Sequence, residues 1–134
     1  MVLSFGANDT TIEHGLMRVD FPSSLGTLAA ILDEAASMGL RMLVIGPAPV
    51  QDREQSERIQ RLSIAFGKLC RAQSIPFVDV IEPLLSSPVW MAQVTAGDGA
   101  HPAAEGYGVL ADLVLAGGWL DWLRQPQRPH TDAG

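Results

Sequence analysis

The chain has 134 residues, which fits a single domain that buries about two-thirds of the surface its unfolded form exposes. Its formal net charge is −6 at pH 7 and it has no basic patch, so nucleic acid is not an expected partner. No apolar run reaches the roughly 18 residues that span a bilayer. The single cysteine, Cys70, excludes a disulfide within the chain. We expect one domain over residues 1–124 and a flexible polar tail over residues 125–134.

The first expected element is a buried strand over residues 2–5. Val2–Phe5 is a short apolar run that ends at Gly6. It lacks the basic start and the long apolar stretch of a signal peptide, so the chain as it stands is expected in the cytoplasm. Residues 10–22 are mixed and polar, with Gly15 and Pro22 as breakers, and they predict a loop that contains up to one helical turn.

The next three elements alternate between helix and strand. A helix is expected to begin at a cap on Ser23 or Ser24 and to run to about Met38, because apolar residues recur at helical spacing and Gly39 supplies a stop. A continuously apolar strand follows at residues 42–45. A longer helix is expected from about residue 52 to 73, with Cys70 on its apolar face as core packing and a charged face toward solvent. Two i,i+4 ion pairs are expected on that charged face: Glu54–Arg58 and Glu57–Arg61.

The last third of the chain predicts one more strand and one more long helix. The strand covers residues 76–81, and an irregular or briefly helical stretch follows at residues 82–97 with an exposed Trp90. The final helix runs from about residue 103 to 116. Trp119 and Trp122 are expected to cover the end of the sheet. This alternation of strands and helices is typical of an α/β domain whose parallel sheet is covered by helices on both faces.

Polar residues follow the expected strands where each one ends. Asn8 comes directly after the first strand, Pro47 comes directly after the second, and a loop from Asp98 to His101 follows the third after an excursion. Because ligand sites in such sheets gather beyond the carboxyl ends of the strands, we expect all three at one rim. A carboxylate three residues before an imidazole, with small residues between, can hold one ring nitrogen and leave the other free to move protons.

Two short motifs resemble blocks of one enzyme family. Gly6-Ala7-Asn8-Asp9 matches the Gly-x-Asn-Asp block of the SGNH (GDSL-type) hydrolases, a family of esterases and lipases. Asp98-Gly99-Ala100-His101-Pro102 matches the family's Asp-x-x-His block, which sits just before the last helix. The resemblance covers about residues 2–117 and implies a flavodoxin-like three-layer α/β/α fold. It implies that His101 is the general base, that Asp98 orients it, and that Asn8 donates to the oxyanion. By the same resemblance, Gly6 leaves room for the substrate.

One block of that family is missing. The family's nucleophile lies in a Gly-Asp-Ser block at the end of its first strand, and this chain has no such block. Ser4 lies inside the expected strand, and the other serines lie in turn, cap or helix contexts without the exposed strand-to-turn setting of a nucleophile. The resemblance therefore implies an N-terminally truncated domain that lacks its first strands, about 60 residues if each strand–helix unit needs about 30. The Val2–Phe5 strand is then expected to be an exposed edge through which chains self-associate.

Other interpretations of the same residues stay open. In one, Asp98 and His101 are a structural pair that caps the last helix. In another, Asn8 and Asp9 form a turn, and Asp9 is expected to hold this loop in any case. A metal site built from Asp9, His14, Asp98 and His101 lacks the spacing of a known zinc motif, so no metal is expected.

We expect the complete site to hydrolyse carboxylic esters, including acyl esters of lipids or sugars, through an acyl-serine intermediate without metal or organic cofactor. The chain by itself is expected to be inactive, because the nucleophile is missing. The alternative is a non-catalytic binding or interaction module, or a half-site that another chain completes. The segment from Leu84 to Val94, which includes Trp90 and Met91, is the expected apolar wall of the substrate site.

Overall fold

Three parallel strands form the sheet at the centre of the fold. The computed structural model describes residues 1–126, so most of the expected tail, residues 127–134, lies outside it. Strand β1 (Val2–Ser4) pairs with β4 (Leu43–Ile45), and β4 pairs with β5 (Phe77–Val78). The order β1-β4-β5 leaves the other edge of β1 without a partner among the described residues, as expected for this strand.

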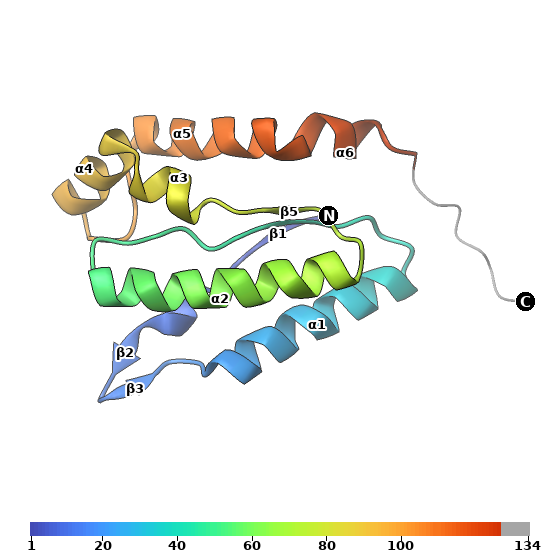
Figure 1. Cartoon of the computed structure of the whole chain (residues 1–134), viewed down its shortest axis with the longest axis horizontal. Coiled ribbons are helices and arrows are strands. Elements are labelled where there is room, and N and C mark those ends of the chain that lie inside the picture. The colour runs from blue at the N-terminus through green and yellow to red at the C-terminus, as the bar shows by residue number, and fades with distance from the viewer. Residues whose placement is uncertain (127–134) are drawn as a thin grey trace, which may run out of the picture.

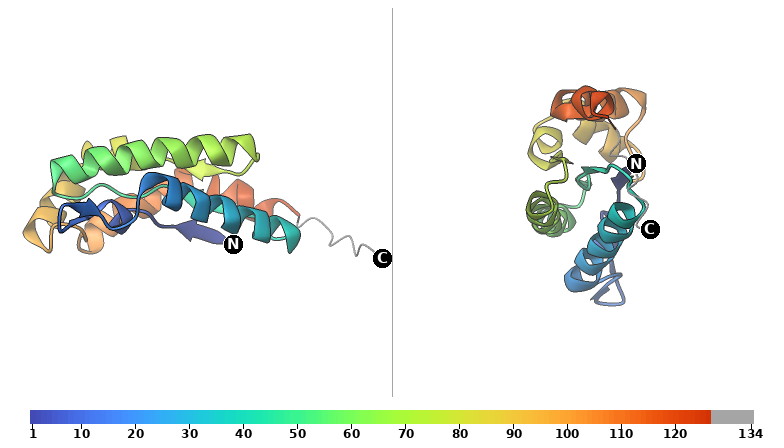
Figure 2. Two further views of the ribbon diagram at one scale, coloured as in Figure 1. Left: turned by 90° about the horizontal axis from the view of Figure 1, so that it is seen from below. Right: turned by 90° about the vertical axis from the view of Figure 1, so that its right-hand side faces the viewer.

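Helices cover both faces of this sheet, which confirms the three-layer α/β/α architecture (Figure 1). One layer contains α1 (Phe21–Ser37) and α2 (Arg53–Ala72). The other contains α3 (Ile81–Leu85), α4 (Pro88–Ala96), α5 (Ala104–Val114) and α6 (Leu120–Arg124). The end-on view on the right of Figure 2 shows the two layers with the strands between them, and the left view looks from below, from the side of α1 and α2. Within residues 1–126, no helix combines the length and the apolar character that a bilayer crossing requires.

Helix α1 begins earlier than the expected cap at Ser23 or Ser24. Oδ1 of Asp20 accepts a hydrogen bond from the backbone N–H of Ser23 at 2.8 Å and therefore caps the helix. Pro22 lies in the first turn, where its missing N–H costs nothing. Ser24 is buried instead and is used for another contact, described below. The apolar face of α1 packs with α2 and the sheet around a core cluster: Leu28, Leu32, Ala35, Met42, Val44, Leu62, Phe66 and Cys70.

Helix α2 has the expected bounds, with Asp52 as its N-cap. The charged side chains on its exposed face, however, have different partners from those expected. The salt bridge on this face joins Arg53 with Glu57, at 3.3 Å between Nε and Oε1. The Nε of Arg58 donates to the backbone carbonyl of Thr10 at 3.0 Å. The expected pairs Glu54–Arg58 and Glu57–Arg61 are therefore wrong, since a backbone carbonyl and a different arginine compete for these side chains.

The second layer contains the largest departure from expectation. Residues 82–97 are mostly helical, and Trp90 is only 2% exposed rather than on the surface. Its indole N–H donates to the carbonyl of Pro49 at 3.1 Å, so the polar atom of the ring is satisfied inside the core. Strand β5 is shorter than expected, because Oδ1 of Asp79 accepts the N–H of Ile81 at 3.1 Å and starts α3 there.

A small hairpin occupies part of the expected loop at residues 10–22. Strands β2 (Ile12–Glu13) and β3 (Leu16–Met17) pair antiparallel around His14 and Gly15. Both turn residues have positive φ, 52° and 80°, which is the backbone of a tight two-residue hairpin turn.

The C-terminal helical segment bends after α5. Residues Leu115–Trp119 form a π-helical turn in which Gly118 has φ 107°, and α6 follows directly. The ring centroids of Trp119 and Trp122 lie 5.5 Å apart. Trp122 is buried with Leu43 of the sheet in a second core cluster, which lies between the sheet and the layer of α3 to α6. Both tryptophans therefore cover the sheet, as expected.

Candidate functional site

The Asp98–His101 loop holds its two side chains in direct contact. Nδ1 of His101 lies 2.7 Å from Oδ2 of Asp98. The other carboxylate oxygen accepts two backbone N–H groups, from Ala100 at 2.9 Å and from His101 at 2.8 Å. The turn needs φ of +85° at Gly99, which glycine adopts without strain. The contact expected between a carboxylate and an imidazole three residues later is present.

These contacts set the charge of Asp98. The hydrogen bond from the His101 side chain, followed by those from the backbone N–H groups of His101 and Ala100, holds the pKa of Asp98 well below its usual value. An ionised carboxylate only accepts hydrogen bonds, so Nδ1 of His101 is the donor in this pair. The Nε2 atom of His101 is then left free to accept a proton.

Neighbouring elements hold this loop in place. The backbone N–H of Gln51, in the segment after β4, donates to the carbonyl of Gly99 at 2.7 Å. Oε1 of Gln93 on α4 accepts the N–H of Gly106 at 2.8 Å, at the start of α5. A Cβ added at Gly106 would lie 2.4 Å from Cβ of Pro102, so α5 starts in close contact with the residue after His101. The position of the imidazole is therefore determined by α4, α5 and the segment after β4 together.

The loop after β1 is held by helices α1 and α2. The hydroxyl of Ser24 donates to Oδ2 of Asp9 at 2.7 Å, which supports the interpretation of Asp9 as a residue that holds the loop. The side chain of Gln55 donates to the carbonyl of Ala7 at 3.2 Å. By contrast, the side chain of Asn8 is exposed, and within residues 1–126 it makes no hydrogen bond. Its amide is available to a ligand.

Gly6 has a structural role that the sequence did not reveal. Its φ is +112°, and a Cβ at this position would lie 3.0 Å from a methyl carbon of Leu62 and 3.2 Å from the ring of Phe66. The missing side chain lets the end of β1 lie against α2 and turns the chain toward Asn8.

Asn8 and His101 line the same open cavity, which has a volume of about 440 Å³. Pro47 lines it too, so the residues expected at one rim of the sheet do meet there. Four large side chains also line the cavity: Phe5, Trp90, Tyr107 and Leu110. Trp90 belongs to the wall expected from residues 84–94, whereas Met91 lines a separate hollow with Leu85. Tyr107 and Leu110 lie three residues apart on one face of α5, a spacing that was present in the sequence as a signal.

Comparison with known proteins gives a family match and a shared fold. The sequence profile of the GDSL-like lipase/acylhydrolase family matches residues 1–109. The chain belongs to this family. A crystal structure of a GDSL-like lipase from Bacteroides thetaiotaomicron has a TM-score of 0.71 to this structure at 22% sequence identity, which shows a shared fold. The match covers 86% of this chain and 59% of that lipase chain. No curated protein shows a significant sequence match to the chain.

The lining of this cavity also includes a serine. Ser4, the last residue of β1, is exposed and is the serine among the residues that line the cavity. It lies within the sheet register opposite Ile45 rather than on a strand-to-turn elbow. Within residues 1–126, no hydroxyl group hydrogen-bonds to the ring of His101. Ser4 and His101 therefore line one cavity without a hydrogen bond between them.

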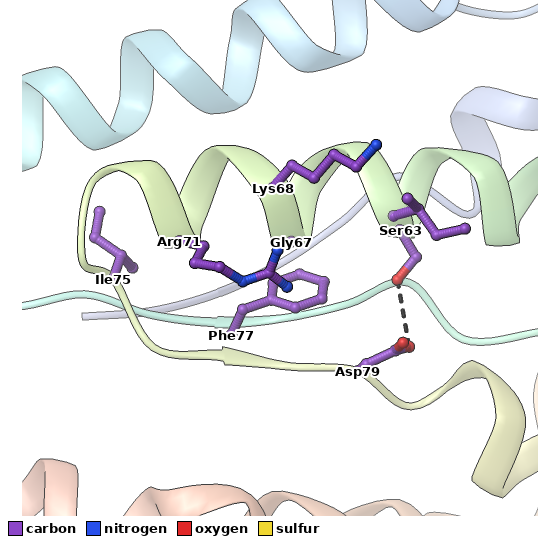
Figure 3. Close-up of a pocket in the computed structure, with 8 residues that line it drawn as sticks. Ser63, Gly67, Lys68, Arg71, Ile75, Phe77 and Asp79 are labelled. Atoms are coloured by element: carbon purple, nitrogen blue, oxygen red, sulfur yellow. Dashed lines mark hydrogen bonds between the residues drawn. The ribbon is translucent and has the colours of Figure 1, made fainter.

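Other hollows and clusters in the described part of the chain do not resemble a hydrolase site. The hollow in Figure 3 lies between α2 and β5 and contains two cations, Lys68 and Arg71. Its Ser63 hydroxyl lies 3.5 Å from Oδ1 of Asp79, a long contact, and no histidine lines it. Within residues 1–126, no three His, Cys, Asp or Glu side chains are placed to hold a metal ion.

Proposed function

We propose that this chain carries the acid–base and oxyanion part of a serine-dependent ester hydrolase site. The observation that supports this most directly is the Asp98–His101 contact at 2.7 Å on the rim of a cavity that Asn8 also lines. In this proposal His101 is the general base, Asp98 orients it and stabilises its protonated form, and Asn8 donates to the oxyanion.

The proposed ester hydrolysis uses the two groups that are free to react: Nε2 of His101 and the side-chain amide of Asn8. Nε2 of His101 takes the proton of a serine hydroxyl as its oxygen attacks the carbonyl carbon of the ester. The resulting oxyanion accepts a hydrogen bond from the Asn8 amide, a contact worth on the order of 3 kcal/mol of transition-state stabilisation. His101 then returns the proton to the leaving alcohol, and water releases the acyl group by the same steps in a second round.

The serine itself comes, in this proposal, from outside residues 1–126. The free edge of β1 is the place where a further parallel strand would pair, and its carboxyl end would then lie beside Ser4 and the cavity. The chain as given is therefore expected to be inactive. The cavity walls from Phe5, Trp90 and Leu110 suit the apolar part of an uncharged ester, such as an acyl ester of a lipid or a sugar.

A second candidate is an interaction module that kept the fold and not the chemistry, or a half-site that another chain completes. The same free edge of β1 favours this candidate, since unpaired N–H and C=O groups on an edge strand are a template for another strand. The sedimentation behaviour of the chain separates this candidate from the first. A stable dimer whose association is lost when Leu3 is replaced by proline would favour pairing through β1.

Two experiments test the proposal. The coding region upstream of Met1 should contain an in-frame Gly-Asp-Ser segment, and a stop codon immediately upstream would contradict it. The chain extended through that segment should react with a fluorophosphonate probe and hydrolyse a chromogenic acetate ester, whereas the chain as given should do neither.

Variants of the extended chain separate catalysis from folding. H101A should lose at least about 10³-fold in turnover and N8A about 10²-fold to 10³-fold. H14A is the matched control, because His14 is an exposed imidazole in the β2–β3 turn, and it should retain full turnover. Labelling of Ser4 in the chain as given, or full activity of H101A, would overturn the proposal.

A further inference from the structure

One large side chain of the His101 cavity is open to solvent. Tyr107 on α5 lines this cavity and is 48% exposed. Trp90 lines it too but is only 2% exposed, and Phe5 and Leu110 are half-buried. Among the large side chains of the lining, a ligand in the cavity therefore meets the ring of Tyr107 most directly.

The ring of Tyr107 is held in place by its neighbours. Its centroid lies 6.4 Å from that of Trp90, and the planes of the two rings are nearly perpendicular, at 87°. This edge-to-face arrangement is a favourable geometry for an aromatic pair. Trp90 is itself fixed, because its indole N–H donates to the carbonyl of Pro49 at 3.1 Å. A ligand that packs against Tyr107 therefore has little side-chain freedom to remove.

The backbone next to Tyr107 is fixed as well. The N–H of Gly106 donates to Oε1 of Gln93 at 2.8 Å, and an added Cβ at Gly106 would lie 2.4 Å from Cβ of Pro102. His101 precedes this contact in the chain, Tyr107 follows it, and both line the same cavity. The segment thus presents an imidazole and an aromatic wall in a fixed relation to one another.

The charges around the cavity disfavour an anionic ligand. Asp9 lines the cavity, and no lysine or arginine is among the described residues that do so. Asp98 lies close by, with Oδ2 2.7 Å from Nδ1 of His101. A carboxylate in the cavity would meet charges of its own sign without a guanidinium or ammonium group to pair with, whereas an uncharged ester would not be repelled.

We propose that Tyr107 is the specificity-determining residue of this cavity, and that it selects uncharged esters with a medium-length hydrocarbon chain over acetate esters. The inference rests on the proposed function, which places the ester carbonyl at Nε2 of His101 and the Asn8 amide. The hydrocarbon chain then lies along the ring of Tyr107 and displaces water from it. The carboxylate product, as an anion, binds less tightly than the ester and leaves.

The chain as given allows a direct binding test, because it should bind an ester without hydrolysing it. Tyr107 is the only tyrosine of the sequence, so its ring gives a single set of signals in an aromatic ¹H–¹³C spectrum. Methyl hexanoate should shift these signals saturably and show nuclear Overhauser contacts from its chain to the ring. Methyl acetate, which has four fewer methylene groups to bury, should bind at least about ten-fold more weakly. Hexanoate at pH 8 should bind at least about five-fold more weakly than its methyl ester.

Three variants separate a contact with the ligand from a structural effect, with the imidazole signals of His101 as the readout. Y107A should lower the preference for methyl hexanoate over methyl acetate at least about three-fold, whereas Y107F keeps the ring and should keep the preference. L115A is the matched control, since Leu115 follows α5, is 49% exposed and lies outside the cavity lining. It should also keep the preference. The nuclear Overhauser contacts in the unchanged chain carry the test even if Y107A does not fold.

Four outcomes would overturn the proposal. They are the absence of a saturable shift of the Tyr107 signals, an undiminished preference in Y107A, an equal loss of preference in L115A, and hexanoate binding as tight as that of its methyl ester. All of these measurements use binding to the chain as given, and none uses ester turnover. Failure of this proposal is therefore distinguishable from failure of the proposed hydrolase function, which is tested by turnover in the extended chain.

Discussion

Nδ1 of His101 lies 2.7 Å from Oδ2 of Asp98, and the opposite oxygen of the same carboxylate accepts two backbone N–H groups. One side chain thus organises the turn and also orients the imidazole. The same contacts serve a structural cap and a catalytic pair equally well. What favours the catalytic interpretation is the open cavity that His101 shares with Asn8.

The Asp98 carboxyl should remain ionised in acid where ordinary carboxyls titrate. Its pKa lies below the usual value of 3.8, first because of the hydrogen bond from the His101 side chain. A lowered pKa in the folded state contributes stability that is present above pH 3.8 and is lost as the pH falls through the folded value. A ¹³C titration of the aspartate carboxyls should show the midpoint of Asp98 below 3.8. H101A should move its midpoint back toward 3.8, and a midpoint near 3.8 in the unchanged chain would contradict this expectation.

Cys70 should be inert in the folded chain. It is buried among apolar side chains on α2, and this burial raises the pKa of its thiol to about 11. At pH 8 only about one thiol in a thousand would then be the reactive thiolate. A thiol-reactive dye at pH 8 should label it only after the chain is unfolded in urea. Rapid labelling without denaturant would show that α2 opens far more often than its packing indicates.

Truncating a leucine in the core beneath α1 should cost much of the stability of the domain. Leu32 is fully buried between α1, α2 and the sheet, so Leu32→Ala should lower the free energy of unfolding by about 2–5 kcal/mol. Leu16 in the hairpin is 73% exposed, and Leu16→Ala should change that free energy by about 0.5 kcal/mol or less. Urea unfolding of both variants measures the difference, and equal costs would place Leu32 outside the core.

A side chain at Gly6 should destabilise the fold, although the same substitution in α1 should not. Gly6→Ala combines a φ of +112° with a Cβ only 3.0 Å from Leu62, and it should cost about 1–3 kcal/mol. Gly26 lies inside α1 with nothing within 4 Å of an added Cβ. Gly26→Ala should therefore raise the free energy of unfolding by about 0.5–1 kcal/mol. Opposite signs in thermal unfolding are expected, and destabilisation by both would argue against the conformational explanation.

The sequence predicted much of this fold because the relevant interactions are local. The apolar residues of α2 recur with the period of a helix, which indicates a helix with one buried face. The residues of β4 are continuously apolar, which indicates a strand buried between two helical layers. The Asp98–His101 contact was predictable for the same reason, since three residues and a glycine turn are enough to close it.

By itself, then, the amino-acid sequence determined the parallel α/β order, most of the element bounds and the Asp98–His101 pair. Tertiary structure decided the contacts between segments that are distant in the chain. Trp90 can be buried because its indole N–H donates to the carbonyl of Pro49, 41 residues away in the chain. Arg58 donates to the carbonyl of Thr10 rather than pairing with Glu54. Asn8 and His101 were expected at one rim, but the packing of α4 and α5 decided that Trp90, Tyr107 and Leu110 line their shared cavity. Such contacts depend on where whole elements pack, which no local pattern encodes.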